Sequence, residues 1–364
     1  MKARSRGELQ ALVLISLLIS NAQVAAKSVI EPCNSNDSCP ALLAYRLPWG
    51  SSFSDIASRF QVNISEILAA NNIDPARPLS RSYQVLAANS LVKVPVSCSC
   101  VDGIRWSIST AYTVRAADTF YSISQGYGEL VSPQQIRSVN GVNETTAKGG
   151  LVAGQRMVVP LPCTCFGNRN NGAEAVYMSY VVEKGENLSG IADAYGTTVT
   201  DLETVNGLTL PRVRPRDILS VPLPACSLTN LNWHNESLTV ANGSYALTAN
   251  NCINCGCAPT DLSLQCSPSG IAASCTHLQC KGSTLFIGQA YEKRADFGCN
   301  LTACVYRGHL NNKIFSRYLY LTKLCMCVCV EKRVEAIRDR STSSYIILNS
   351  RSNVVTSPNQ SCKA

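Results

Sequence analysis

The sequence predicts an α+β fold of three tandem strand-helix-helix-strand (βααβ) modules, clamped by disulfides and followed by a cysteine-rich domain and a disordered tail. Three segments end in near-identical strings, KVPVSCSC, VVPLPCTC and SVPLPAC, which marks an internal repeat. Within each segment, apolar residues at helical spacing lie between two strand-like runs. The chain also carries 19 cysteines, enough for an extensive disulfide framework in an exported protein.

The N-terminus predicts export. Residues 1–26 combine a basic start, MKARSR, with an apolar run over residues 9–19 and small residues before Lys27, a pattern typical of a signal peptide. The apolar run is about half as long as a membrane-spanning helix, which makes a retained anchor the weaker interpretation. We expect cleavage after Ala26 and secretion.

Eight Asn-x-Ser/Thr sequons support this interpretation, because acceptor sites at this density predict a glycosylated extracellular surface. The last sequon starts at Asn359. The other seven start at Asn36, Asn63, Asn143, Asn187, Asn235, Asn242 and Asn300.

The formal charge of +8 does not indicate a nucleic-acid partner. Residues 309–364 hold nine Lys/Arg and three Asp/Glu, whereas residues 27–308 hold twenty of each sign. A nucleic-acid-binding protein needs a basic face on its folded part. The neutral body therefore excludes this class of function.

Each repeat begins with a strand-like run: YRLP near Tyr45, AYTV at Ala111 and SYVV at Ser179. A polar turn follows each run. The next segment is amphipathic, with apolar residues at helical spacing, and predicts a first helix of about three turns. A second helix is predicted for ISEILAAN, SPQQIRSVN and VTDLETVN.

Polar residues bound the second helix at both ends. Its expected N-caps are Ser65, Ser132 and Thr200, residue types whose side chains accept a hydrogen bond from the first turn. Each helix ends at an asparagine, which tolerates the left-handed conformation that helices use to stop. These asparagines are Asn71, Asn140 and Asn206.

A second strand closes each repeat, and we expect the proline that follows to end its pairing. The valines before these prolines are Val94, Val159 and Val221. The order strand, helix, helix, strand, with a G-[DES]-[TNS]-[LF] turn and a Val-Pro strand, resembles the LysM module. The third repeat matches best and the first is most diverged, since Pro48, Trp49 and Gly50 replace its usual turn.

The resemblance gives the domain organisation. After the signal peptide at residues 1–26, the modules are expected at residues 43–97, 108–162 and 177–224, with a cysteine-rich domain at 226–308 and an atypical basic tail at 309–364. The Cys-x-Cys separators and the cysteine-rich region resemble the plant LysM domain-containing GPI-anchored proteins (LYP type). This likeness covers about residues 28–316.

The LYP resemblance also implies disulfide pairings. Sequence reasoning alone permits fifteen connectivities for the first six cysteines. The physical need is clear, because a unit of about 50 residues buries too little core to be comfortably stable alone. By resemblance, the implied pairs are Cys33 with Cys100, Cys39 with Cys165, and Cys98 with Cys163.

The C-terminal region departs from the LYP pattern. It ends NSRSNVVTSPNQSCKA, without the hydrophobic tail that a GPI anchor signal requires. Residues 27–308 hold fifteen cysteines, an odd number. We therefore expect Cys325 to pair with one of them and the C-terminus to be altered, so that this form is soluble or differently attached.

In LysM modules the glycan lies in a shallow groove between the turn before the first helix and the loop before the second strand. The corresponding segments here are residues 50–53 with 89–93, 118–121 with 153–157, and 185–188 with 215–219. The middle repeat is our first choice. The glycan-binding residues implied by resemblance are Asp118, Thr119, Phe120, Tyr121, Gly154, Gln155, Arg156, Met157, Gly185 and Glu186.

Some of these residues have a structural alternative. Met157 serves either as an apolar floor for sugar, beside Gln155 as a polar contact, or as core; Asp118 and Thr119 either meet sugar or only cap the first helix. Asn187 begins a sequon inside the turn of the third groove. We hypothesise that glycosylation there blocks or reshapes that groove.

The sequence gives little indication of an enzyme. The chain has no G-x-S-x-G, no H-E-x-x-H and no Gly-rich phosphate loop. A carboxylate pair such as Glu183 and Glu203 is available for glycoside hydrolysis, as in any chain with this many acids. The Cys252, Cys255 and Cys257 cluster favours disulfides over metal in an exported protein. We expect no metal site and no cofactor.

The sequence therefore predicts a non-enzymatic cell-surface receptor or co-receptor of plant innate immunity. Its expected ligands contain N-acetylglucosamine, as fungal chitin and bacterial peptidoglycan oligomers do. The family implies a LysM receptor-like kinase as signalling partner, and a homo-oligomer remains open. The alternatives are a cell-wall hydrolase and a soluble, secreted glycan-binding decoy. The expected location is the extracellular face of the plasma membrane, by family likeness, although the tail lacks an anchor signal.

Overall fold

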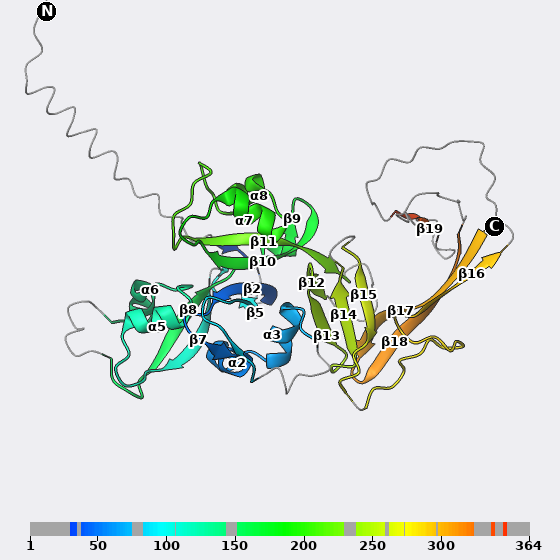
Figure 1. Ribbon diagram of the computed structural model, residues 1–364, viewed down its shortest axis with the longest axis horizontal. Helices are drawn as coiled ribbons and strands as arrows, with labels where there is room; N and C mark the ends of the chain where they lie inside the picture. Colours follow the sequence, from blue (N-terminus) through cyan, green and yellow to red (C-terminus); the bar gives the residue numbers. More distant parts are fainter. Residues whose placement is uncertain are drawn as a thin grey trace, which may run out of the picture.

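The computed structural model describes residues 30–34, 38–74, 83–105, 107–142, 151–228, 238–258, 262–272, 274–295, 298–323, 336–338 and 345–347. The predicted signal peptide, the sequons at Asn36, Asn143, Asn235 and Asn359, and Cys325 lie outside these residues. Figure 1 shows the three repeats side by side, with the cysteine-rich region extending from one side of them. Within the described residues, no helix is long and apolar enough to cross a membrane.

Each repeat forms strand, helix, helix and strand in the predicted order. The helices have seven or eight residues, about two turns, so the prediction of three turns for the first helix is wrong. The bounds are β2 Ser38–Arg46, α2 Phe53–Phe60, α3 Ile64–Ala70 and β5 Leu91–Ser99; β7 Ser107–Thr113, α5 Phe120–Gly126, α6 Pro133–Val139 and β8 Arg156–Pro162; β10 Ala173–Val181, α7 Leu188–Tyr195, α8 Val199–Val205 and β11 Ile218–Ser227.

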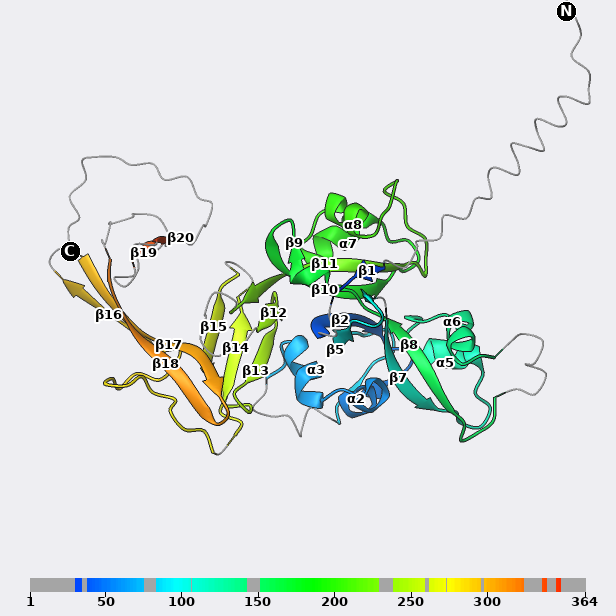
Figure 2. The ribbon, with the colours of Figure 1, turned by 180° about the vertical axis from the view of Figure 1, so that it is seen from behind.

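The first and third units share one sheet. Its strand order is β12-β11-β10-β2-β5, with β12 at Thr239–Ala241 and β9 (Arg169–Asn170) pairing with β10. β10 and β2 run parallel, with Met178 opposite Leu42. The β7–β8 hairpin of the second unit forms a separate sheet beside them, as Figures 1 and 2 show.

Strand β2 is buried on both faces, which explains its unbroken apolar run. Leu43 and Tyr45 belong to a core shared with the second unit, whereas Leu42 and Ala44 belong to the core of the third unit. One strand thus contributes to the packing of all three units.

The second strands continue past their prolines, so the prediction that proline ends the pairing is wrong. Pro95 lies opposite Leu42, Pro160 opposite Ser109 and Pro222 opposite Tyr177. β5 and β8 each pair on one side only, and a proline is accommodated where its position needs no ladder N–H.

Two of the three predicted N-caps of the second helix are displaced. Ser132 caps α6 as predicted, accepting from the Gln135 N–H. The other two helices begin two residues earlier than expected, after Asn63 and Thr198. Thr198 accepts from the Asp201 N–H, while Asn63 makes no capping bond.

The asparagines that end the second helices act as anchors rather than as left-handed stops. Asn140 has φ −94° and ψ 7°, which is not left-handed. Its amide donates to the carbonyls of Ile136 and Val158, and its Oδ1 accepts from the Val158 N–H at 2.9 Å. Asn71 and Asn206 make the same three bonds in their own units, to Ile67 and Lys93 and to Leu202 and Ser220.

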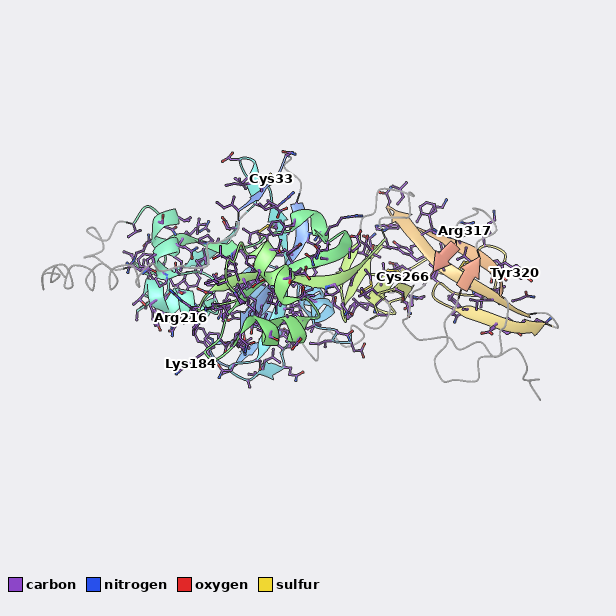
Figure 3. The ribbon with its side chains drawn as sticks, turned by 90° about the horizontal axis from the view of Figure 1, so that it is seen from above. Cys33, Lys184, Arg216, Cys266, Arg317 and Tyr320 are labelled. Atoms are coloured by element: carbon purple, nitrogen blue, oxygen red, sulfur yellow. A yellow bond between two sulfur atoms is a disulfide. The ribbon has the colours of Figure 1, made fainter. Side chains whose placement is uncertain are left out.

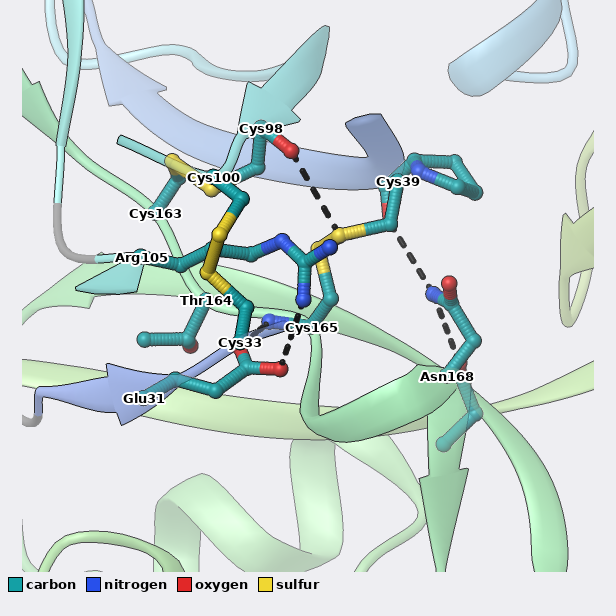
Figure 4. The surroundings of a disulfide bond; sticks show 12 residues. Glu31, Cys33, Cys39, Cys98, Cys100, Arg105, Cys163, Thr164, Cys165 and Asn168 are labelled. Carbon is teal, nitrogen blue, oxygen red and sulfur yellow. Dashed lines mark hydrogen bonds and ion pairs between the residues drawn. A yellow bond between two sulfur atoms is a disulfide. The ribbon is translucent and has the colours of Figure 1, made fainter. Parts of the chain in front are cut away.

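Disulfides join the ends of the first and second units, with the three pairs that the family resemblance implies. Figure 4 shows them packed around an ion pair between Arg105 and Glu31. Glu31 also accepts from the Cys165 N–H and is buried. Each closed loop of this kind stabilises a small domain by about 2–4 kcal/mol. The pairs are Cys33–Cys100, Cys39–Cys165 and Cys98–Cys163.

The cysteine-rich region forms two three-stranded sheets, β13 (Tyr245–Thr248), β14 (Ile253–Cys257) and β15 (Leu264–Pro268), then β16 (Ala290–Ala295), β17 (Gly298–Leu310) and β18 (Lys313–Lys323). Its disulfides are Cys226–Cys257, Cys252–Cys275, Cys255–Cys266 and Cys280–Cys304. Cys252, Cys255 and Cys257 are therefore all in disulfides.

The prediction of a disordered tail from residue 309 is wrong for its first part. Residues 313–323, KIFSRYLYLTK, form β18 and pair along β17. The apolar residues in this stretch are compatible with a strand as well as with the start of a membrane-spanning helix. The pairing register with β17 depends on the folded structure and has no signal in the sequence. Short strands β19 (Ala336–Arg338) and β20 (Tyr345–Ile347) pair with each other.

Candidate functional site

In every unit, the turn before the first helix is joined to the turn before the second strand by a pair of backbone hydrogen bonds. In the second unit the Val114 N–H donates to the Gln155 carbonyl at 2.9 Å, and the Gly154 N–H donates to the Val114 carbonyl at 2.8 Å. The equivalent pairs are Leu47 with Ser90 and Asn89, and Val182 with Asp217 and Arg216. These pairs align the three grooves residue by residue.

The second-strand side of each groove is a tight turn of four residues. In the second unit it closes with the Gln155 N–H donating to the Val152 carbonyl. Gly154 has φ +86° in this turn, and its aligned residues Asn89 and Arg216 have φ 66° and 73°. The position thus requires a left-handed residue, which glycine adopts without strain.

A carboxylate braces the other side of the second groove. Asp118 Oδ2 accepts from the Arg115 N–H and from the Tyr112 hydroxyl, each at 2.7 Å. Burial, and then the bond to Asp118, raises the pKa of Tyr112 to about 12. In the third unit, Glu186 accepts from the Glu183 N–H and the Tyr180 hydroxyl in the same way.

The structure places several predicted contact residues in structural roles. Asp118 and Glu186 hold their own turns, and Thr119 caps α5 by accepting from the Ser122 N–H. Met157 is 2% exposed and lies in the core, so its prediction as the apolar floor of the groove is wrong. Phe120 is buried in the same core.

Other predicted residues do face solvent at the second groove. Tyr121 is 52% exposed, and its hydroxyl accepts from the Gln125 amide. Gly154, Gln155 and Arg156 are exposed in the opposite turn, as is Gly185 in the third unit.

Sequence reasoning missed Val152. This residue begins the second-unit turn and is 65% exposed, although it is apolar. The sequence carries no signal for it, because the adjacent apolar residue Leu151 packs against the core.

The first groove is closed by its own chain. β3 (Ser51–Ser52) pairs with β4 (Val85–Leu86), across the space between the two turns. Ser51 and Ser52 are only 3% and 7% exposed, whereas the aligned Thr119 is exposed. Their backbone groups face β4 rather than a ligand.

The third groove is braced against its neighbours by ion pairs. Arg216, in the turn before β11, donates to Glu129 of the second unit at 2.9 Å. Glu183, in the turn before α7, pairs with Arg46 of the first unit. One of the two carboxylates considered for glycoside hydrolysis is therefore held in an ion pair. Figure 3 shows Lys184 and Arg216, one from each turn, on the same side of the molecule.

No cluster of three metal-ligating side chains occurs among the residues that the structure describes. His309 contacts the Tyr306 hydroxyl and lies in β17, far from the grooves along the chain. At the second groove, the two turns present the exposed side chains of Tyr121 and Val152.

Comparison with known proteins agrees with this geometry. The LysM domain profile matches residues 50–80, 112–160 and 180–222. The chain is 43% identical over 310 residues to LysM domain-containing GPI-anchored protein 1 of Arabidopsis thaliana, across 84% of this chain and 74% of that protein. The chain belongs to the plant LysM domain-containing GPI-anchored protein family.

More distant proteins also match. The chitin elicitor-binding protein of Oryza sativa subsp. japonica is 30% identical over 284 residues, covering 76% of each chain. Among solved structures, the ectodomain of a receptor-like kinase is 22% identical, with a TM-score of 0.42, over 52% of this chain and 94% of that one.

Proposed function

We propose that this LYP protein binds N-acetylglucosamine-containing glycans without chemical conversion, and that the second unit holds the principal site. The observation that carries the proposal is a contrast in exposure. Thr119, Tyr121 and Val152 are exposed at the second groove, whereas Ser51 and Ser52 at the first groove are buried and paired with β4. Backbone amides can meet the N-acetyl groups while the apolar side chains contact sugar faces. Because each such hydrogen bond contributes only about 0.5–1.5 kcal/mol net, several sugars must bind at once.

The ligand class proposed is chitin oligomers, peptidoglycan oligomers or both, since both present N-acetylglucosamine. A relative is named for binding a chitin elicitor, which supports the chitin arm. We further propose a cell-surface role in innate immunity, with a LysM receptor-like kinase as signalling partner. No cofactor is required.

The test is a pull-down of the secreted chain on insoluble chitin and on peptidoglycan, with soluble oligomers of each as competitors. A matched pair of variants locates the site. Gly154→Val places a β-branched residue at φ +86° in the second groove, and Gly172→Val does so at φ +80° in the turn before β10, at the end of that strand away from the groove. Neither new Cβ meets an atom within 4 Å, so both act through backbone strain, about 1–3 kcal/mol.

We expect Gly154→Val to lower affinity at least tenfold and Gly172→Val to leave it unchanged at similar stability. Equal losses in both variants would move the site away from the second groove. Failure of the wild-type chain to bind chitin or peptidoglycan would overturn the proposal, and release of new reducing ends would support the hydrolase instead.

A further inference from the structure

The first helix of each unit is capped at the same aligned position, and in the third unit the capping residue, Asn187, is also the asparagine of a glycosylation sequon. Ser52, Thr119 and Asn187 precede α2, α5 and α7, and each side-chain oxygen accepts from the backbone N–H three residues on. Serine, threonine and asparagine cap helices about equally well. Among these three caps, Asn187 begins an Asn-x-Ser sequon, completed by Ser189.

The geometry of Asn187 suits glycosylation. Asn187 and Ser189 are both exposed, and Asn187 has an extended backbone, with φ −136° and ψ 165°. Its cap uses only Oδ1, which accepts from the Gly190 N–H at 2.9 Å. Within the part of the chain that the structure describes, Nδ2 donates no hydrogen bond that would be lost. A sugar on Nδ2 therefore leaves the helix cap intact.

The modification is ordinary N-glycosylation during secretion. Nδ2 of Asn187 forms a bond to the anomeric carbon of an oligosaccharide carried on a lipid diphosphate. The bond from that carbon to the phosphate oxygen breaks, the lipid diphosphate leaves, and Nδ2 gives up one proton.

The position of this sugar matters more than its presence. Asn187 lies in the turn that forms one side of the third groove, aligned with Thr119 of the second groove. The other side is the turn of Arg216 and Asp217, which backbone hydrogen bonds join to Val182. An N-linked glycan begins with two N-acetylglucosamine residues joined as they are in chitin. The attached sugar is thus chemically a ligand of the groove beside it.

We propose that the glycan on Asn187 occupies the third groove as a tethered, intramolecular ligand. The inference rests on the proposed function, because it assumes that open grooves of this chain bind N-acetylglucosamine. A short tether gives an effective concentration on the order of millimolar. The third groove is then filled by the chain's own sugar, and the second groove remains for external glycan.

The chain supplies a matched control. Asn63 is also a sequon residue at a helix N-cap. It precedes α3, a second helix, and so lies outside the two turns that form a groove. Its side chain donates to Glu66 rather than capping the helix.

The experiment compares four secreted full-length proteins: wild type, Ser189→Ala, Asn187→Thr and Asn63→Thr. Ser189→Ala keeps the asparagine cap and removes the sequon. Asn187→Thr installs the residue that caps α5. Glycopeptide mass spectrometry measures occupancy of Asn187, and titration calorimetry with a soluble chitin hexamer measures how many hexamers bind each chain.

We expect Asn187 to be occupied in wild type, and the number of hexamers bound to double in both Asn187-sequon variants. Asn63→Thr should bind as wild type does. Unmodified Asn187, or an unchanged number of hexamers after removal of its sequon, would overturn this inference while leaving second-groove binding in place. Absence of binding in all four proteins would instead overturn the proposed function.

Discussion

The first and second units share a frame but differ at the groove. Both have the same helix and strand order, and both use an asparagine, Asn71 or Asn140, to tie the second helix to the second strand. In the first unit, the turn before the first helix pairs with its own loop through β3 and β4. In the second unit the Asp118 carboxylate holds that turn by accepting from the Arg115 N–H.

The difference begins at one aligned position. Asp118 holds the turn before the first helix of the second unit. The aligned residue of the first unit is Ser51, which has no carboxylate to accept a hydrogen bond from the Tyr45 hydroxyl. Tyr45 therefore donates to the Gly126 carbonyl of the second unit at 2.9 Å, and Arg59 donates to the same carbonyl. The first unit thus acts as support for the second, and repeats of one fold have diverged into a support and a candidate site.

The largest effect is expected from removing the asparagine anchor that both units share. Asn140→Ala and Asn71→Ala each remove three hydrogen bonds, so each should lower the free energy of unfolding by about 2–4 kcal/mol. Because Asn140 anchors the strand that leads from the second groove, only its variant should also weaken glycan binding. Denaturant unfolding and calorimetry measure both quantities. Equal loss of binding in the two variants would contradict the distinction.

The next effect concerns the brace. Tyr112→Phe removes the hydroxyl that donates to Asp118, at a cost of about 1–2 kcal/mol, and should loosen the second groove. Tyr45→Phe removes the matching hydroxyl of the first unit and should cost similar stability without changing affinity per folded chain. An affinity loss confined to Tyr45→Phe would reverse the assignment of support and site.

A smaller effect is expected for the exposed ring at the groove. Tyr121→Ala should weaken binding of a chitin hexamer about fivefold, roughly 1 kcal/mol, because the proposed site uses its exposed ring as a contact for sugar. Tyr83→Ala removes a ring of the first unit that is also exposed and lies two residues before β4, and serves as the control. Titration calorimetry compares the two, and a larger loss from Tyr83→Ala would count against the second groove.

The smallest effect is a pH dependence. The folded pKa of Tyr112, about 12, lies above its ordinary value of 10.0 because of burial and the bond to Asp118. Its stabilisation is therefore complete below pH 10 and is lost as the pH rises through about 12. The stability difference between wild type and Tyr112→Phe should stay constant below pH 10 and shrink above it. A difference that grows with pH in this window would show that the hydroxyl does not act as the proton donor.

The periodic features of the fold could be predicted from the sequence, and the interactions between units could not. Helix and strand order followed from apolar spacing, since Ile67, Ile136 and Leu202 each lie one turn before an asparagine. The sheet shared by β2 and β10 has no local signal, because parallel pairing between distant strands is settled by three-dimensional packing.

The same limit applied to the grooves. The turns were located correctly, yet the burial of Met157 and the closure of the first groove by Val85 and Leu86 depend on which face of each turn packs inward. The role of the three asparagines was predicted wrongly. In sequence, an asparagine that bonds the backbone of both the second helix and the second strand looks the same as an ordinary residue at a helix end.

The most direct test of the account is hydrogen exchange of the full chain with and without a chitin hexamer. The amides of residues 115–119 and 152–155 should become protected when the hexamer binds. Those of residues 49–52 and 85–90 should exchange at the same rate in both states, because β3 and β4 already occupy the first groove. Ligand-dependent protection in the first unit, without any in the second, would contradict the account.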